Sequence, residues 1–555
     1  MPSPRLPYDG MDMRTLLAAQ AARHGERLFL AWEPFEGDGA EWTYAAFVEA
    51  VRGFAAGLHA RGVTPGERVL IHLDNCPEFL IAWLGCAWAG AVGVTSNTRL
   101  SAEEVAYIAA HSGAVGGVTQ PRHATTVQDA LPPGAWMALT ETDAGAAPAE
   151  PRPCSTLDFA AITGDPKDAP NRPHDPTAPF AVQYTSGTTA RPKAVLWTHA
   201  NALWGAQVSA EHEDLDPSDL HLVHLPLFHT NAQVYSVLAA LWAGAAVVLM
   251  PRFSASRFWP VSQRRGCTFT SMVGFCIRAL ADYPVPAHRY RRWGSAVCEP
   301  ATDARYGVET LGWWGMTETI THGIVGSTRL PNVRNSMGRP AGGYEVFVLD
   351  GESRPTPAGQ VGDLYIRGIR GLSLFQEYVG DPAATAAAFT ADGLFITGDR
   401  VRVGESGELY FADRIKDMLK VGGENVAASE VERVILTVPG VREAAVVGRP
   451  HNMLGETVAA FVIPTDAAKE DATLADRVQE ACRGALAAFK QPREVWLVET
   501  FPRATLEKVA KAELRRLLVS ARPAASGDPG TVERPGECTD VGRPDVAARA
   551  AQGPA

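Results

Sequence analysis

Residues 183–194 of this chain read Gln-Tyr-Thr-Ser-Gly-Thr-Thr-Ala-Arg-Pro-Lys-Ala and directly follow the apolar residues 180–182. Serine and threonine hydroxyls, a glycine and a lysine lie close together in this stretch. A loop of this kind presents backbone N–H groups and hydroxyls to phosphate oxygens, with a cation nearby. The stretch therefore predicts a phosphate-binding loop after a buried strand. A serine- and threonine-rich surface turn is the plain alternative.

The loop differs from a P-loop in two positions. Gly187 and Lys193 share the glycine-to-lysine spacing of a P-loop. However, Pro192 stands where the second glycine is needed, and Ala194 stands where a Ser or Thr binds Mg²⁺. Residues 194–197 are strand-like, whereas a P-loop lysine opens a helix. The sequence therefore excludes a P-loop NTPase and predicts a loop that joins two strands like a hairpin.

Helix and strand patterns alternate on the N-terminal side of this loop. Thr43 can cap a helix that is followed by the apolar strand 68–72, and Ser101 with Glu104 forms a capping-box signature. Such alternation favours an α/β architecture with largely parallel sheets. The apolar face of the first helix would consist of Phe47, Val51, Phe54 and Leu58.

The sequence pattern changes near Asp413. A turn at 421–424, a helix capped by Ser429 with Glu432, and further strands and helices predict a small α+β C-terminal domain. After Ser520 large apolar side chains almost disappear, so the tail is expected to be disordered. The expected divisions are an N-terminal domain 1–412, a hinge 413–417, a C-terminal domain 418–520 and a tail 521–555.

Composition sets broad limits on function. A chain of 555 residues is long enough for at least two domains, and its net charge of -11 argues against nucleic acid or anionic membranes as partners. The cysteines are scattered without a CxxC pair, and the N-terminus lacks the features of a secretory leader. The apolar run 79–94 is too short and too rich in glycine for a membrane span. A cytoplasmic protein with reduced thiols is expected.

Further motifs follow in an order that resembles the adenylate-forming (AMP-binding, ANL superfamily) acyl-CoA synthetase family. The resemblance covers roughly residues 13–516, and within the family the chain looks closest to the carnitine/crotonobetaine-CoA ligase branch. The segments that carry it are the loop 183–194, Leu225-Pro226-Leu227-Phe228-His229, Trp314-Gly315-Met316-Thr317-Glu318-Thr319, Phe395-Ile396-Thr397-Gly398-Asp399, Asp413-Arg414-Ile415-Lys416-Asp417 with the loop 421–425, and Pro502-Arg503 followed by Lys508.

The resemblance implies a large N-terminal adenylate-forming domain with mixed and parallel sheets, plus a small mobile α+β C-terminal domain. It implies an acid–thiol ligase that forms acyl-AMP from ATP and a carboxylic acid and then a thioester with CoA, with Mg²⁺ as the metal. The implied nucleotide-binding residues are Thr185, Ser186, Gly187, Thr188, Thr189, Lys193, Trp314, Gly315, Thr317, Asp399, Arg414 and Lys508. The implied catalytic residues are Lys508, Thr317, His229 and Glu318, the last also being the metal ligand.

The resemblance also places an acyl pocket and a moving domain. Lys416 is the implied hinge, and the loop around Gly422 and Gly423 would form one wall of a pantetheine tunnel. The mixture of apolar and amide groups in the pocket favours a small or medium acid with a polar group over a long fatty acid. The implied pocket residues are His229, Asn231, Gln233, Val273, Gly274, Gly294, Ser295, Ala296, Met316 and Ile320.

Departures from the family pattern leave alternatives open. Ala190, Ala194 and Glu507 stand where the family often has glycine, and Trp314 replaces the usual tyrosine. One alternative keeps the adenylate but changes the acceptor to a carrier-protein thiol or an amine, or the acid to an unusual one such as nitrite. Another is a degenerate nucleotide-binding homologue. His221, His224 and His229 raise the question of a metal site, but no Cys or carboxylate cluster completes one, so histidines that only form hydrogen bonds are expected. Cys298 is interpreted as a buried, structural cysteine.

Overall fold

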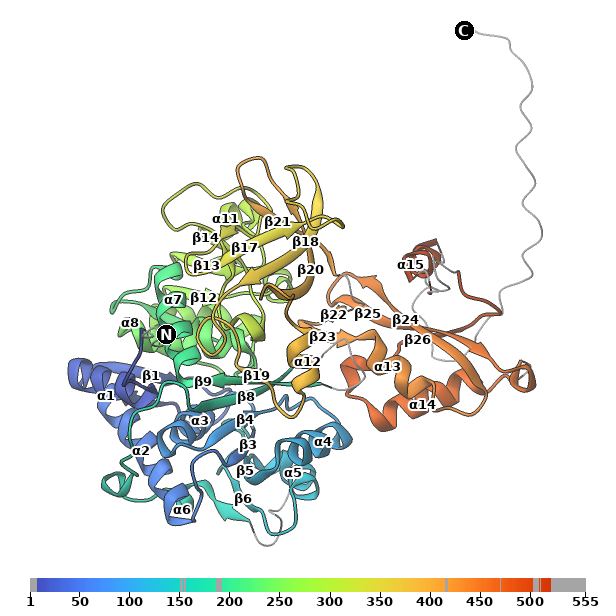
Figure 1. The fold of residues 1–555 in the computed structure, drawn as a ribbon. Coiled ribbons are helices and arrows are strands. Elements are labelled where there is room, and N and C mark those ends of the chain that lie inside the picture. The colour runs from blue at the N-terminus through green and yellow to red at the C-terminus, as the bar shows by residue number, and fades with distance from the viewer. Residues whose placement is uncertain are drawn as a thin grey trace, which may run out of the picture.

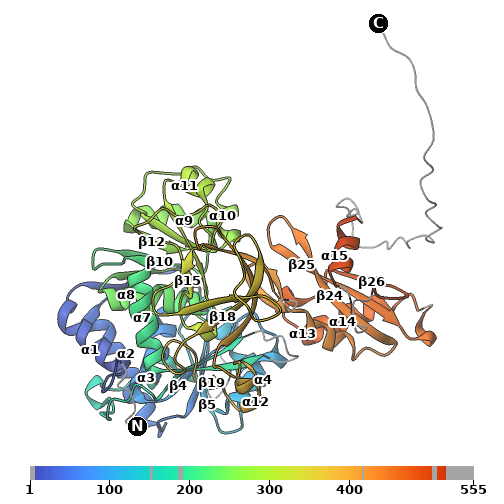
Figure 2. The same cartoon turned by 45° about the horizontal axis from the view of Figure 1, so that its top comes forward.

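The computed structural model describes residues 7–149, 153, 156–185, 192–414, 418–469, 471–502, 509 and 511–520. Figure 1 shows a large N-terminal part and a smaller C-terminal domain that lies to one side of it. In the turned view of Figure 2 the smaller domain again lies to the side, with β25 (Gly455–Pro464) and α13 (Ala428–Ile435) towards the larger part. The predicted α/β fold with a small C-terminal domain is confirmed.

The first sheet carries the predicted phosphate loop. Its strand order is β19-β9-β8-β4-β3-β5-β6-β7, and it is parallel from β7 to β8. β8 then pairs with β9 in antiparallel orientation, which confirms the predicted hairpin. The strands are β3 (Arg68–His72), β4 (Val92–Thr95), β5 (Ala114–Thr119), β6 (Trp136–Leu139), β7 (Leu157–Asp158), β8 (Pro179–Thr185), β9 (Lys193–Thr198) and β19 (Glu377–Tyr378).

A second sheet of the same domain leads into the motif segment 314–319, which begins at the last residue of its strand β14. Its strand order is β16-β15-β14-β13-β12-β10-β11-β1-β2, with a parallel centre from β1 to β14. The strands are β1 (Leu28–Trp32), β2 (Ala40–Thr43), β10 (Leu220–Val223), β11 (Ala246–Leu249), β12 (Phe269–Ser271), β13 (Arg292–Ser295), β14 (Glu309–Trp314), β15 (Ile324–Val325) and β16 (Arg339–Pro340).

Two helices of the large part begin at the predicted caps. Thr43 caps α2 (Tyr44–Ala60), and Ser101 with Glu104 forms a complete capping box on α4 (Ala102–Ser112), as the sequence predicts. The other helices here are α1 (Met13–His24), α3 (Pro77–Ala89), α5 (Ala124–Ala130), α6 (Phe159–Ile162), α7 (His199–Glu213), α8 (Ala239–Ala243), α9 (Ala255–Arg265), α10 (Gly274–Ala279), α11 (Pro300–Tyr306) and α12 (Pro382–Ala387). A π-helix spans Asn231–Leu238.

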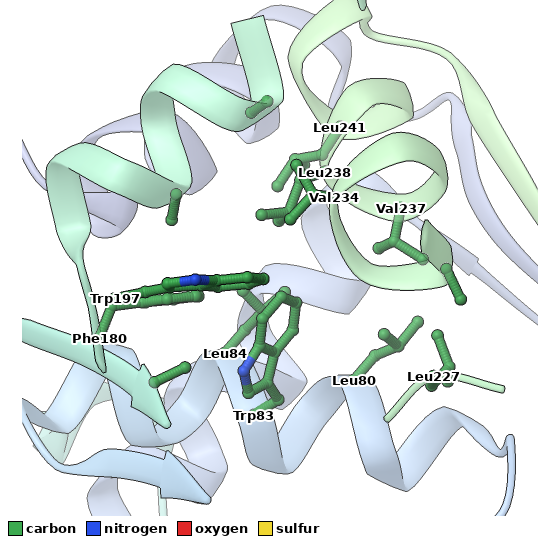
Figure 3. Packing of buried hydrophobic residues seen from close by; sticks show 14 of the residues in the cluster. Leu80, Trp83, Leu84, Phe180, Trp197, Leu227, Val234, Val237, Leu238 and Leu241 are labelled. Atoms are coloured by element: carbon green, nitrogen blue, oxygen red, sulfur yellow. The ribbon is translucent and has the colours of Figure 1, made fainter. Parts of the chain in front are cut away.

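A core of large side chains lies between α3, α7 and this π-helix. Figure 3 shows Trp197 of β9 beside Phe180 of β8, with Trp83 of α3 below and Val234 and Leu238 of the π-helix above. Trp83, Trp197 and Phe180 are fully buried. The indole N–H of Trp197 also donates to the Thr317 carbonyl oxygen at 2.9 Å, so this core holds a segment of the candidate site.

A third sheet closes the large part, and its last strand leads to the C-terminal domain. The order is β17-β18-β20-β21, all antiparallel. β21 continues to Arg414, whereas residues 415–417 lie outside the described part of the chain. The strands are β17 (Glu345–Leu349), β18 (Val361–Arg367), β20 (Phe395–Val403) and β21 (Leu409–Arg414), with the short β19 between β18 and β20 belonging to the first sheet.

The C-terminal domain is a sheet in the order β23-β22-β25-β24, with β26 beside β25. Its elements are β22 (Met418–Val421), β23 (Glu424–Ala427), α13, β24 (Val441–His451), β25, α14 (Leu474–Ala485), β26 (Glu494–Leu497) and α15 (Lys511–Ser520). Among the residues that the structure describes, none forms a helix with the length and apolarity that crossing a bilayer requires.

The predicted cap of the first C-terminal helix is wrong. Ser429 lies inside α13, and the residue that precedes the helix is Ala427, which makes no side-chain cap hydrogen bond. β23 runs directly into the helix. Glu432 is used elsewhere, because its Oε1 accepts from the Val446 N–H at 2.7 Å and pairs with Lys511 at 2.6 Å. The strand–helix junction and the packing on β24 and α15 thus replace the predicted local cap.

Candidate active site

The phosphate loop begins and ends on neighbouring strands. Thr185 ends β8 and Lys193 begins β9, and the two residues are register partners. Ser186, Gly187, Thr188 and Thr189 lie outside the described residues. The hairpin therefore holds the two flanks of the predicted loop together, so that both Thr185 and the Lys193 side chain lie at its base.

A buried carboxylate lies beside the base of this loop. Glu318 is in the short 3₁₀ turn Thr317–Thr319 after β14 and is 5% exposed. Its Oε1 accepts a hydrogen bond from the Tyr378 hydroxyl at 2.9 Å. The Lys193 ammonium lies 4.4 Å from the centre of the same tyrosine ring. The predicted phosphate cation and the predicted metal ligand thus share one neighbour, Tyr378.

The predicted adenine and ribose residues contact each other directly. The indole N–H of Trp314, at the end of β14, donates to Asp399 Oδ2 at 2.8 Å. Asp399 is 1% exposed and lies on β20, where Arg414 is its register partner on β21. The side chain of Arg414 lies outside the described part of the structure. The tryptophan that replaces the family's tyrosine therefore supplies a donor to the candidate ribose carboxylate.

Trp314→Phe is expected to raise the Kd for ATP about tenfold, because the phenyl ring keeps an aromatic face but Asp399 loses a charge-assisted hydrogen bond. The preference for ATP over 3′-deoxy-ATP should fall as well, since the carboxylate is no longer oriented towards the ribose. Calorimetric titration with both nucleotides measures both quantities. An equal loss of affinity for the two nucleotides would show that Trp314 acts on the base alone.

A chain of polar side chains connects the phosphate segment to the predicted pocket helix. Thr230 Oγ1 donates to Gln183 Oε1 at 2.9 Å and lies 3.3 Å from Thr317 Oγ1. The Gln183 amide donates in turn to Gln233 Oε1 on the π-helix. Thr230, Gln183 and Gln233 are buried, whereas Thr317 is half-buried. The chain of contacts fixes the threonine at 317 relative to Gln233 and the neighbouring Asn231.

The backbone around the predicted adenine segment is tightly constrained. A Cβ at Gly315 would lie 2.3 Å from the Tyr235 hydroxyl, so only glycine fits there. Ile320 has φ +64°, which is a rare conformation for a β-branched residue. Such outliers persist where the surrounding structure holds them, and they cluster at functional sites. Met316 and Ile320 therefore flank a turn whose shape is imposed by its neighbours.

The predicted acyl pocket residues come from several elements that converge. Asn231 and Gln233 lie on the π-helix, Gly274 begins α10, and Gly294 and Ser295 end β13, followed by Ala296. The ring of Trp313 lies across Gly294, where a Cβ would approach a ring carbon to 1.6 Å. Trp313 also stacks on His322, with centroids 4.5 Å apart at 15°.

The C-terminal domain presents its first hairpin to this site. Gly422 and Gly423 form the turn between β22 and β23, both with positive φ, and a Cβ at Gly423 would lie 4.0 Å from Val273. The next residue, Glu424, receives a hydrogen bond at 3.1 Å from His229 Nε2. The predicted tunnel glycines and the predicted pocket residues His229 and Val273 are therefore brought together.

Glu424 is the centre of this interdomain contact. It is 4% exposed and pairs with Arg99 at 3.4 Å, while Asn97 Nδ2 donates to it at 3.2 Å. Burial works to raise the pKa of Glu424, but the charges of His229, Arg99 and Lys490 outweigh burial, and the pKa is lowered. The carboxylate is thus ionised at the domain boundary.

Some site residues were not indicated by the sequence. Tyr378 and Trp313 make the contacts just described, but each lies on a strand that carries no periodic signal of its own. Glu424 lies in the motif loop 421–425, and only its contacts were not predicted. Tyr378 belongs to a strand of two residues, and Trp313 is the neighbour of a motif residue. Lys508 and Lys416 lie outside the described residues.

The fold, a large α/β domain with a small C-terminal domain, together with the order of the motifs defines the class of protein. Residues 17–379 match the model of the AMP-binding enzyme family, and residues 430–508 match the AMP-binding enzyme C-terminal domain. The chain therefore belongs to the AMP-binding enzyme family, the adenylate-forming acyl-CoA synthetases that its motifs resemble.

The chain is similar to known CoA ligases over nearly the whole length of those proteins. The chain is 34% identical over 525 residues to the crotonobetaine/carnitine–CoA ligase of Escherichia coli O139:H28, covering 91% of this chain and 99% of that protein. It is 32% identical over 528 residues to the ligase of the same name from Salmonella paratyphi C, with the same coverage. A solved structure of o-succinylbenzoate CoA synthetase from Bacillus subtilis has a TM-score of 0.75 at 24% identity, covering 90% of this chain and 98% of that chain.

Proposed function

We propose that this acyl-CoA synthetase activates a short carboxylic acid that carries a polar group. The reaction has two halves. The carboxylate attacks the α-phosphorus of ATP, which forms acyl-AMP and releases pyrophosphate. The thiol of CoA then attacks the acyl carbon, loses its proton and displaces AMP, which leaves the thioester. We place both steps in the cytoplasm, where ATP and CoA are present.

The observation that carries the proposed acid size is the packing of Trp313 across Gly294. Two rings that also contact each other hold the indole: His322 stacks on it at 4.5 Å, and Tyr235 meets it edge-on at 5.6 Å. Trp313 is 7% exposed and His322 is fully buried. A ring held in this way closes the end of the proposed pocket, so that a long alkyl chain has no room beyond Gly294.

Two buried polar atoms support a polar group on the acid. Asn231 Oδ1 and Ser271 Oγ have no hydrogen-bond partner among the described residues. Ser271 is the register partner of Gly294, so it belongs to the same wall. Buried polar groups are normally satisfied, and a ligand with a hydroxyl or N–H group would satisfy these. Carnitine, named in the relatives, is itself a short acid with a hydroxyl and a quaternary ammonium group.

Trp313→Ala is expected to admit acids several carbons longer, because it removes the ring that closes the pocket. The ratio of kcat/KM for octanoate to that for the best short acid should rise at least about tenfold. Pyrophosphate release measures both rates. Trp259→Ala is the matched control, since Trp259 is also buried and stacks on a histidine, His288, at 5.3 Å. Trp259 lies on α9 and is not one of the proposed pocket residues. The same rise in the control would contradict a pocket role.

The nucleotide roles proposed for the site follow the contacts above. Asp399 and Arg414 would bind the ribose, Trp314 and Gly315 the adenine, and Thr317 the α-phosphate. One buried carboxylate suits a Mg²⁺ ion that takes its other ligands from phosphate oxygens and water, and Glu318 fits this role. When bound, the ion supplies positive charge to the triphosphate. The β- and γ-phosphates would be held by Thr185, Ser186, Gly187, Thr188, Thr189 and Lys193.

The orientation of the C-terminal domain supports a role in the second half-reaction. With Glu424 on His229, the Gly422–Gly423 turn borders the proposed pocket, where it would form a wall of the pantetheine tunnel. Lys508 would approach the α-phosphate and the acid in the other orientation, for the first half. Lys416 is the proposed hinge between the two.

A panel of acids tests the proposal. The enzyme is incubated with ATP, Mg²⁺ and carnitine, crotonobetaine, short hydroxy acids or fatty acids, with and without CoA, while pyrophosphate and thioester are measured. Thioester from a short polar acid is expected. Pyrophosphate that forms only with another acceptor, such as a carrier protein or an amine, would overturn the CoA assignment. Nucleotide binding without pyrophosphate from any acid would indicate a degenerate homologue.

A further inference from the structure

Tyr378 lies between two groups that carry opposite charges. It belongs to β19, where it is the register partner of Val195 on β9, and it is 6% exposed. Its backbone N–H donates to Thr385 Oγ1 at 3.0 Å, and its ring packs on Phe375 with centroids 4.7 Å apart. The phenol is therefore held from its backbone and from its ring before any ligand binds.

The hydroxyl of Tyr378 fixes one carboxylate oxygen of Glu318. The donor–acceptor distance is 2.9 Å, and both side chains are buried. In this pair the phenol hydroxyl is the donor and the carboxylate oxygen is the acceptor. A carboxylate with one oxygen held in this way cannot turn freely about its terminal bond. This matters for Mg²⁺, which demands near-ideal octahedral geometry.

The ring face of the same residue lies near Lys193. The ammonium is 4.4 Å from the ring centre, which is within the range of a cation–π interaction. Lys193 stands at the base of the phosphate loop, at the first position of β9. One side chain thus contacts the proposed phosphate cation with its ring and the proposed metal ligand with its hydroxyl.

We propose that Tyr378 is a positioning residue that couples the phosphate-binding Lys193 to the magnesium ligand Glu318. This inference rests on the proposed roles of these two residues. The hydroxyl orients the carboxylate towards the metal, and the ring keeps the ammonium at the triphosphate. The two contacts are separable, because phenylalanine removes only the first and leucine removes both.

The test uses α,β-methylene-ATP, which binds but cannot release pyrophosphate. Its Kd is measured by calorimetry in Mg²⁺ and in EDTA, and the ratio of the two gives the gain in affinity from magnesium. Tyr378→Phe should leave the Kd in EDTA unchanged and lower the gain about tenfold, the usual loss when a group that orients a metal ligand is removed. Tyr378→Leu should weaken binding in EDTA as well, since Lys193 loses the ring.

Tyr410→Phe is the matched control. The hydroxyl of Tyr410, on β21, donates to Glu408 at 3.1 Å, and Arg402 lies 3.8 Å from the centre of its ring. This tyrosine therefore also contacts a carboxylate with its hydroxyl and a cation with its ring, but in the third sheet. An unchanged magnesium gain in Tyr378→Phe, or an equal loss in the control, would overturn the proposal. A wild-type enzyme that shows no gain from magnesium and forms no pyrophosphate would instead contradict the proposed function.

Discussion

Replacing Lys508 with alanine is expected to slow acyl-AMP formation by about 10²- to 10³-fold, the usual loss for one group that stabilises charge in a transition state. Thioester formation from preformed acyl-AMP should largely persist. The reason for this asymmetry is that Lys508 would act only while the acid attacks ATP. Pyrophosphate release measures the first half-reaction, and thioester formation from synthetic acyl-AMP measures the second.

Lys511→Ala provides a nearby comparison for this prediction. Lys511 begins α15 and pairs with Glu432 at 2.6 Å within the C-terminal domain. It is therefore committed to a structural contact and should leave both half-reactions near their normal rates. If Lys508→Ala lowers both half-reactions together, the residue supports the domain and not the adenylation step.

Much of the fold was predictable because its signals are local. The cap at Thr43, the capping box of Ser101 and Glu104, and the strands that flank the phosphate loop all depend on residues close in sequence. Caps and strands depend on residue types at short, regular spacings, and such spacings can be read directly from a sequence. The change of sequence pattern near Asp413 predicted the small C-terminal domain, and the family resemblance implied the same arrangement.

The parts that were not predictable depend on tertiary contacts. Tyr378 meets Glu318 across 60 residues of sequence, and Trp313 closes the proposed pocket only because Gly294 lies on the neighbouring strand. Ser429 has the residue type of a cap, but the junction of β23 with α13 starts the helix before it. Local preference is a weak guide where a strand or a distant side chain decides the geometry.

A second connection between the domains is formed by Lys490, and its replacement is also expected to have a large effect on the rate of thioester formation. Lys490 of the C-terminal domain is 3% exposed, lies 2.9 Å from Glu430 and forms an ion pair with Glu104 of α4. Burial works to lower the pKa of Lys490, but the two carboxylates outweigh burial, and the pKa is raised. The ammonium is therefore charged, and it pairs with two carboxylates that meet at the domain boundary.

Glu104 connects the capping box of α4 to the small domain. Its Oε2 accepts from the Ser101 N–H at 2.7 Å and from the Ala487 N–H at 3.2 Å. Ser101 Oγ in turn donates to the Ala485 carbonyl at 3.0 Å. The same residues that begin α4 thus hold the end of α14 and the turn after it. This contact exists only while the C-terminal domain is docked as observed.

Lys490→Met is expected to destabilise the docked domain by about 3 to 5 kcal/mol, because it leaves the buried Glu430 and the half-buried Glu104 without their cation. Thioester formation from preformed acyl-AMP should fall at least about tenfold, whereas acyl-AMP formation, which is proposed to use the other orientation, should change little. Thermal unfolding and the two half-reaction assays measure these effects.

Glu104→Gln separates docking from the stability of the small domain. Glutamine can still complete the capping box, so α4 should remain intact, and Lys490 keeps its pair with Glu430. Only the interdomain charge is lost. Slower thioester formation with an unchanged melting temperature is therefore expected, since the folded domains persist but dock more weakly. If Glu104→Gln leaves thioester formation at the wild-type rate while Lys490→Met abolishes it, Lys490 acts by stabilising its own domain, and the docked orientation does not depend on this ion pair.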